Sequence, residues 1–133
     1  MFTPTVRVLL VDDYEPFRRF LACTLRERRG LQIVGEASDG IEAVCRAEEL
    51  KPDLILLDIG LPSLNGIEVA RQIRRLAPES KILFVSQESC SDVVHEALSL
   101  GAAGYVMKTM ARSELLAAVE AVLEGGQFLG SGL

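Results

Sequence analysis

The sequence predicts an α/β fold of the (βα)5 type: a doubly wound, parallel, five-stranded sheet in the strand order 2-1-3-4-5. Three observations predict it, namely five short apolar runs, helical periodicity between these runs, and connections of only a few residues. Strands that alternate with helices through short connections form a parallel sheet covered on both faces, with right-handed crossovers. In this order, strands 1 and 3 lie at the topological switch point, where such sheets bind ligands.

The expected strands are short, rich in valine, leucine and isoleucine, and closed by polar residues. A continuous apolar run is typical of a parallel strand that is buried on both faces. The run at 54–57 is fully apolar and is therefore expected to be central. The expected strands are residues 6–11, 31–37, 54–57, 81–85 and 105–107.

The segments between the strands carry the signals of helix starts and ends. Pro16 suits the first turn of a helix, and Asp39 suits the cap of the next one. Ser91 or Asp92 is expected to cap the fourth helix, and Ser113 or a neighbour to start the last. The expected helices are residues 15–29, 40–50, 66–76, 91–100 and 113–124.

Length and composition indicate one ordinary domain. The chain has 133 residues, of which 49% are hydrophobic and 25% are charged, which suits a packed core. The net charge of -5 argues against direct nucleic-acid binding, which needs a concentrated basic surface. Three cysteines without metal-ligand spacing are typical of reduced thiols, and no apolar run approaches the roughly 20 residues that span a membrane. We therefore expect a cytoplasmic protein without membrane contact.

Polar residues that carry chemistry follow four of the five strands. They are Asp12 and Asp13 after the first strand, Asp58 after the third, Ser86 after the fourth and Lys108 after the fifth. Because the carboxyl ends of parallel strands meet at one edge, these side chains are expected to share a pocket. Three neighbouring carboxylates repel one another unless a hard cation such as Mg²⁺ lies between them. The pattern predicts a site for a divalent cation and a phosphoryl group.

Asp58 is the candidate nucleophile of this site. It ends the most apolar strand and is expected to sit deepest, where an unpaired charge would be costly. A carboxylate that attacks phosphorus forms an acyl phosphate. Lys108 could hold one phosphoryl oxygen as a point charge, and the Ser86 hydroxyl could donate to another. Of Asp12 and Asp13, one is expected to bind the metal directly and the other through water; taken singly, either could be only a helix cap.

These residues and the segments around them resemble the receiver domain of two-component response regulators, which has a CheY-like, flavodoxin-like fold. The segments are VRVLLVDD, DIGLPSLNGIE, VS at the fourth strand and GAAGYVMK at the fifth. They are most similar to receivers of the NarL/FixJ/LuxR type, which precede a helix-turn-helix domain. The resemblance implies a receiver over residues 1–125. It also implies that residues 126–133, with GGQF, begin a linker to an output domain outside this chain.

The resemblance also implies the roles of the site residues. Asp58 would accept a phosphoryl group from a phosphohistidine on a partner sensor histidine kinase. Asp13 would ligate Mg²⁺, Asp12 would act mostly through water, and the backbone carbonyl of Gly60 would complete the protein ligands. The only reaction expected of the chain is phosphorylation and dephosphorylation of its own aspartate, so we expect no enzyme in the usual sense.

A phosphorylation-dependent switch is implied as well. Phosphorylation would draw Ser86 inward and move Tyr105 from an exposed to a buried position, a population shift biased by charge. Without the resemblance, Tyr105 would be read as a half-buried strand aromatic. The family further implies homodimers on phosphorylation, and control of transcription through DNA contacts made only by the output domain.

Three positions near the expected pocket depart from the common family pattern. Gln87 stands where a small residue is usual and could crowd the pocket, and Glu88 adds a carboxylate near the rim. Thr109 replaces a proline whose preceding bond the family keeps cis, at a cost of about 3 kcal/mol for another residue. Gln87 leaves open an interaction module that signals without phosphate. An aspartate-nucleophile phosphatase is less favoured, because Gly60 stands where such enzymes carry a second aspartate.

Overall fold

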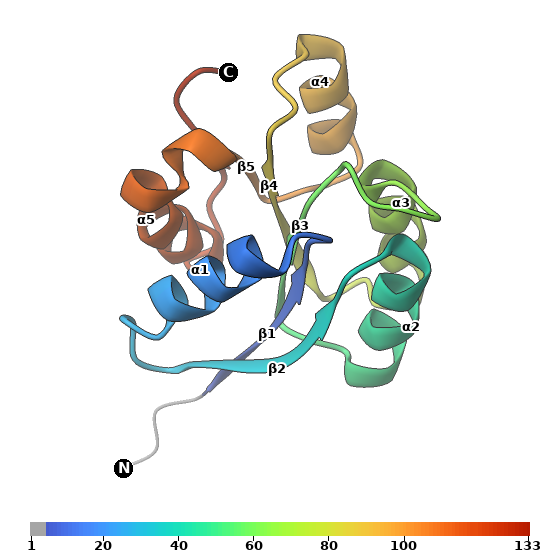
Figure 1. Ribbon diagram of the computed structural model, residues 1–133, viewed down its shortest axis with the longest axis horizontal. Coiled ribbons are helices and arrows are strands. Elements are labelled where there is room, and N and C mark those ends of the chain that lie inside the picture. Colours follow the sequence, from blue (N-terminus) through green and yellow to red (C-terminus); the bar gives the residue numbers. More distant parts are fainter. Residues whose placement is uncertain (1–4) are drawn as a thin grey trace.

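Strands and helices alternate along the chain in the computed structural model, which describes residues 5–133 (Figure 1). The strands are β1 (Val6–Val11), β2 (Leu31–Ala37), β3 (Leu54–Leu57), β4 (Lys81–Ser86), β5 (Gly104–Met107) and β6 (Phe128–Leu129). The helices are α1 (Glu15–Leu25), α2 (Gly40–Leu50), α3 (Gly66–Leu76), α4 (Ser91–Ser99) and α5 (Ala111–Leu123), with the 3₁₀ helix η1 (Lys108–Met110) before α5. The predicted α/β class is confirmed.

The sheet is parallel throughout and has the order β2-β1-β3-β4-β5-β6. The predicted order is confirmed for the first five strands, but the predicted count of five is wrong. Phe128–Leu129, expected to belong to a linker, pairs with β5 as a sixth strand in the part of the chain that the structure describes. Two residues are too few to produce a periodic pattern, so only pairing with β5 defines this strand.

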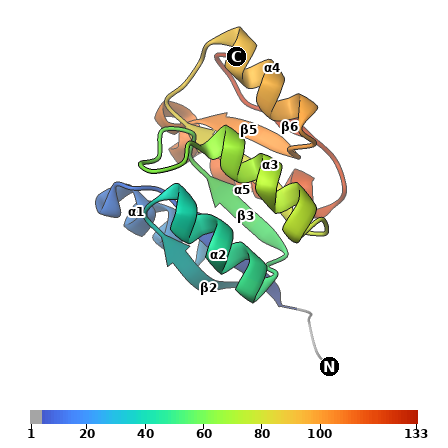
Figure 2. The ribbon, with the colours of Figure 1, turned by 90° about the vertical axis from the view of Figure 1, so that its right-hand side faces the viewer.

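Helices cover both faces of the sheet. In Figure 1, α1 and α5 lie on one face and α2, α3 and α4 on the other; Figure 2 looks onto the face covered by α2 and α3. Alternate residues of a strand point to opposite faces. Leu57 accordingly packs in the core under α2–α4, and Leu56 packs in the core under α1 and α5. Every side chain of β3 is 0% exposed, as predicted for the central strand.

The end of α1 and the cap of α4 differ from the prediction. α1 ends at Leu25 rather than at residue 29, because the N–H groups of Glu27 and Arg28 bond to carbonyls three residues back. Asp39 caps α2 as predicted, accepting from the Glu42 N–H at 2.8 Å. The residue before α4 is Cys90, which makes no side-chain cap, so Ser91 and Asp92 are not the cap.

Among residues 5–133, no helix combines the length and hydropathy needed to cross a membrane.

Candidate functional site

The polar residues at the ends of β1, β3, β4 and β5 meet at one edge of the sheet, as predicted. A cleft of about 280 Å³ opens there. Its walls are formed by Asp13, Tyr14, Asp58, Ile59, Gly60, Ser86, Gln87, Glu88 and Lys108. Asp12 is 1% exposed and reaches the cleft through its contact with Lys108.

Backbone pairing of the central strands fixes two of the aspartates. β1 lies between β2 and β3, and the backbone hydrogen bonds of the sheet continue one residue beyond the ends of β1 and β3. The Asp12 N–H donates to the Ala37 carbonyl, and the Asp58 N–H donates to the Val11 carbonyl, both at 3.1 Å. The two aspartates therefore sit on rigid strand ends rather than on loops.

Gly66 also determines where Asp58 lies. The Gly66 N–H donates to the Ile59 carbonyl at 2.8 Å, which folds the loop after β3 back onto the strand end. A Cβ atom at Gly66 would lie 2.1 Å from the Asp58 carbonyl oxygen, so only glycine fits. The sequence prediction did not include this residue. The Asn65-Gly66 pair was visible as a turn former, but the close approach depends on the folded loop.

Each of Asp12, Asp13 and Asp58 offers a carboxylate oxygen within 4.8 Å of the others. Asp13 is exposed, Asp58 is 6% exposed and Asp12 is 1% exposed. The prediction that Asp58 sits deepest is therefore wrong. Asp12 is deeper because both of its carboxylate oxygens face protein groups: the Tyr14 N–H donates to Oδ1 at 2.8 Å, and the Lys108 ammonium lies against Oδ2.

The Lys108 ammonium joins the two buried carboxylates. Nζ lies 2.7 Å from Oδ2 of Asp12 and 3.0 Å from Oδ2 of Asp58. Burial lowers the pKa of Lys108, but the contacts with both carboxylates outweigh it and the net shift is upward. Burial raises the pKa of Asp12, and neither Lys108 nor the Tyr14 N–H fully offsets that rise. Lys108 is therefore charged, and Asp12 is held in a costly environment.

The three carboxylates suit a hard divalent cation. Oδ2 of Asp12 is buried and receives no directed hydrogen bond from residues 5–133, although the Lys108 ammonium lies close to it. One ammonium also leaves an excess of negative charge among the three carboxylates. All the ligand atoms on offer are oxygens, which is the set that Mg²⁺ binds. The residues present therefore fit the predicted ion.

Ser86, Glu88 and Tyr105 form a chain of hydrogen bonds beside the cleft. Ser86, 2% exposed, accepts from the Glu88 N–H at 3.1 Å. The Tyr105 hydroxyl donates to the Glu88 carbonyl at 2.5 Å. Tyr105 is 0% exposed, so the half-buried alternative is wrong and the ring has the buried position. Burial raises the pKa of Tyr105 to about 12, which keeps its hydroxyl a donor.

The three unusual positions lie in different places. Gln87 and Glu88 line the cleft as predicted, and Glu88 also accepts from the Cys90 N–H at 3.0 Å. Thr109 does not line this cleft, so its placement on the rim is wrong. It lines a neighbouring cavity because η1 turns the chain away directly after β5. All peptide bonds in residues 5–133 are trans, including the one before Thr109.

Two contacts of the site were not predicted from the sequence. Oδ1 of Asp58 accepts the Ile59 N–H at 2.7 Å, and the Phe17 ring lies against the Lys108 ammonium, 4.6 Å from Nζ to the ring centroid. Phe17 lies in the first turn of α1. No sequence signal links it to a lysine at the other end of the chain.

Comparison with known proteins identifies the family of this chain. Residues 8–120 match the response regulator receiver domain, and the chain belongs to this family. The resemblance predicted from the motifs is confirmed.

Two curated relatives are similar over most of this chain. The transcriptional regulatory protein LiaR of Bacillus subtilis is 38% identical over 120 residues. A putative transcriptional regulator of Pseudomonas aeruginosa is 41% identical over 119 residues. Each match covers 90% of this chain and 57% of the relative, so the chain spans little more than half the length of these proteins.

Solved structures of the same family superpose closely. A LuxR-family two-component response regulator from Aurantimonas sp. has a TM-score of 0.88 at 35% identity, covering 93% of this chain and 89% of that one. The signal receiver domain of the putative regulator NarL from Mycobacterium tuberculosis has a TM-score of 0.86 at 32% identity, covering 92% and 99%. Both agree with the predicted subfamily.

Proposed function

We propose that this receiver is a phosphoacceptor, in which Asp58 takes a phosphoryl group from a phosphohistidine of a partner sensor histidine kinase with the help of Mg²⁺. The placement of Asp58 carries the proposal. It is nearly buried yet opens onto the cleft, with the Lys108 ammonium 3.0 Å from its Oδ2 and two further carboxylates within 4.8 Å.

The chemistry asks mainly for positioning and charge. A carboxylate oxygen of Asp58 attacks phosphorus while the bond from phosphorus to the donor nitrogen breaks, and its electron pair goes to the imidazole. Lys108 moves its contact from the carboxylates to a phosphoryl oxygen, and Ser86 turns from the Glu88 N–H to donate to another. Mg²⁺, when bound, neutralises charge on the transferring group.

The residues that would hold the ion are those predicted from the sequence. Asp13, exposed at the cleft, would be a direct ligand together with Asp58, and the Gly60 carbonyl would add a third protein oxygen. Asp12 would act through water, since its Oδ1 already accepts the Tyr14 N–H. Ordinary turnover of external substrates is not part of the proposal, because position 60 has no second carboxylate.

The output that we propose is control of transcription. Relatives named as transcriptional regulators are longer than this chain, so the output would reside in a DNA-binding domain outside it. Residues 1–125 would form the body of the receiver, and residues 126–133, which add β6 to the edge of its sheet, would lead toward that domain. Phosphorylation would favour homodimers, and the protein would act in the cytoplasm, where sensor kinases present their phosphohistidine.

The test is an intact-mass measurement after incubation with Mg²⁺ and acetyl phosphate. We expect a gain of one phosphoryl group that disappears with EDTA and in Asp58→Asn. Asp13→Asn should require far more Mg²⁺, whereas Asp92→Asn, on the exposed first turn of α4, should behave like the wild type. No gain in the wild type, or a gain that persists in Asp58→Asn, would contradict the proposal.

The same measurement separates the two alternatives. Gln87 on the cleft wall is the residue that leaves open a module that signals without phosphate, which would show Mg²⁺-independent behaviour and no mass gain. A phosphatase would release phosphate steadily from phosphoesters. We expect neither result.

A further inference from the structure

An aromatic ring completes the surroundings of the Lys108 ammonium. We propose that Phe17 is a positioning residue, whose ring holds this ammonium beside Asp12 and Asp58 and thereby sets the rate of phosphoryl transfer. The inference rests on the proposed function of Asp58. It concerns a side chain that does not line the cleft.

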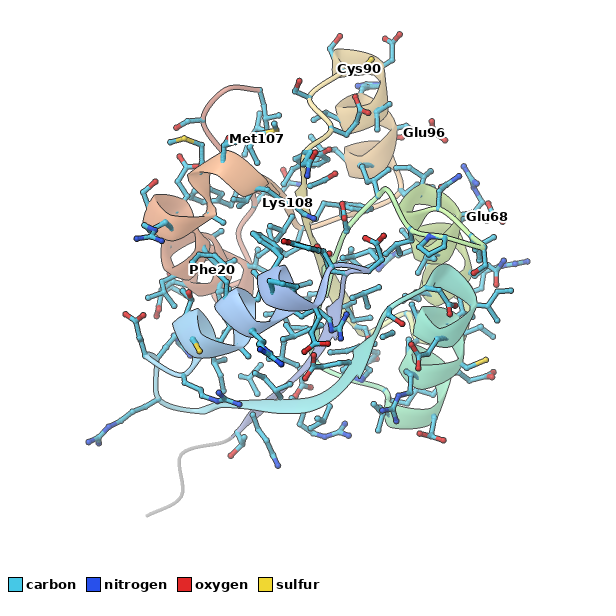
Figure 3. The ribbon with its side chains drawn as sticks, in the orientation of Figure 1. Phe20, Glu68, Cys90, Glu96, Met107 and Lys108 are labelled. Atoms are coloured by element: carbon cyan, nitrogen blue, oxygen red, sulfur yellow. The ribbon has the colours of Figure 1, made fainter. Side chains whose placement is uncertain are left out.

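Phe17 and the cleft lie on different sides of Lys108. The lysine lines the cleft, and it also lines two adjoining cavities of about 490 and 250 Å³, both of which Phe17 lines as well. Nζ is 4.6 Å from the ring centroid, and the lysine side chain is only 11% exposed. Figure 3 shows Lys108 close to α1, the helix that carries Phe20. Without the ring, the ammonium could swing away from the carboxylates into the larger cavity.

The kind of contact suits a group that must release its partners. A lysine ammonium is a point charge on a flexible stem with three rotatable donors. The face of an aromatic ring attracts a cation electrostatically without neutralising it. A third carboxylate in this place would instead compete with the phosphoryl oxygens for the same N–H groups. Phe17 therefore fixes the charge and leaves the donors of Lys108 free for the incoming group.

The ring itself is held by the start of α1. Pro16 lies in the first turn, and the Phe17 N–H donates to the Tyr14 carbonyl at 3.1 Å. The Phe20 ring packs against Phe17 with centroids 5.4 Å apart. Arg18, in the next position, donates to the Asp12 carbonyl at 2.7 Å and so ties the helix to the strand end. The ring position is thus set by the fold rather than by a loose loop.

The experiment compares Phe17→Leu with Phe17→Tyr, which keeps an aromatic face. The rate of Asp58 phosphorylation by acetyl phosphate is measured at saturating Mg²⁺. We expect Phe17→Leu to lower the rate roughly 2- to 30-fold and Phe17→Tyr to stay within about twofold of the wild type. Phe128→Leu, a matched change in β6, should also stay near the wild-type rate. If Phe17→Leu does not fold, Phe17→Met replaces it with the same expectation.

A spectroscopic measurement separates positioning from a general loss of structure. The ring current of Phe17 should shift the ε-methylene protons of Lys108 upfield in the wild type and in Phe17→Tyr, but not in Phe17→Leu. The Mg²⁺ affinity should be equal in all three, since the ring touches no metal ligand. Equal phosphorylation rates for the wild type and Phe17→Leu would overturn this inference alone. A wild type that takes up no phosphoryl group would overturn the proposed function of Asp58.

Discussion

Oδ2 of Asp12 lies 2.7 Å from Nζ of Lys108, and both side chains are withdrawn from water, with 1% and 11% of their surface exposed. This pair joins the first strand of the sheet to the segment after the fifth. Burial nevertheless raises the pKa of Asp12, and the attraction of the ammonium does not fully offset this rise. A buried carboxylate in this environment lowers stability, as is expected where a fold supports the cation and phosphoryl site that we propose.

Replacement of Asp12 tests this cost. A raised pKa means that the folded state binds the proton more tightly than the unfolded chain does. The stabilisation that comes from this tighter proton binding is fully present below pH 3.8, the pKa of Asp12 in the unfolded chain. It is lost as the pH rises through the pKa of Asp12 in the folded state. We therefore expect Asp12→Asn to have a higher free energy of unfolding than the wild type at pH 7 without Mg²⁺, with the difference shrinking in acid. Urea titrations measure it, and a less stable Asp12→Asn would contradict it.

A substitution at Gly66 tests the backbone support of Asp58, the proposed phosphoacceptor. Gly66→Ala would place a Cβ atom 2.1 Å from the Asp58 carbonyl oxygen, so the strand end or the loop must shift. We expect a loss of about 2 kcal/mol or more in the free energy of unfolding and a marked fall in phosphorylation of Asp58. Gly60→Ala is the control for stability, because a Cβ there meets nothing within 4 Å. Equal stability of the two variants would refute this account.

The Tyr105 hydroxyl is expected to order the loop between β4 and α4. Tyr105→Phe removes the donor to the Glu88 carbonyl and should cost about 1 kcal/mol. Hydrogen exchange should become faster at the amides of Glu88 and Cys90. Tyr14→Phe, at a tyrosine that is 63% exposed, is the matched control and should leave both measurements unchanged. Unchanged exchange in Tyr105→Phe would show that the loop does not depend on this bond.

The sixth strand is expected to stabilise the receiver. The Gly130 N–H donates to the Tyr105 carbonyl at 2.9 Å, Ser131 binds the Glu114 carboxylate, and Phe128 packs on the core under α1 and α5. Removal of residues 128–133 should lower the free energy of unfolding by about 2 to 3 kcal/mol. Removal of residues 132–133 alone should change it little. Equal stability of both shortened chains would mean that β6 only rests on the sheet.

Much of the site could be predicted from the sequence because parallel topology is a strong constraint. The central strands are largely buried on both faces and leave apolar runs, so residues 6–11 and 54–57 were predicted with their observed bounds. Residues 31–37 were also predicted with their observed bounds, although this edge strand is only partly buried. Once these strands are parallel, their carboxyl ends share an edge. Asp12, Asp13, Asp58, Ser86 and Lys108 were accordingly predicted together and are found together.

What the sequence determined by itself is thus the fold class, the strand order and the set of polar groups at one edge. Tertiary structure decided the rest: the greater burial of Asp12, the ring of Phe17 against Lys108, the turn of Thr109 away from the cleft, and the pairing of Phe128 with the sheet. Each of these depends on contacts between residues far apart in the chain, and on the direction that the backbone takes after a strand ends. Local periodicity reflects the burial of each segment, so it predicts the strands and their order. It carries no information about contacts between distant residues or about the direction of the backbone after a strand ends.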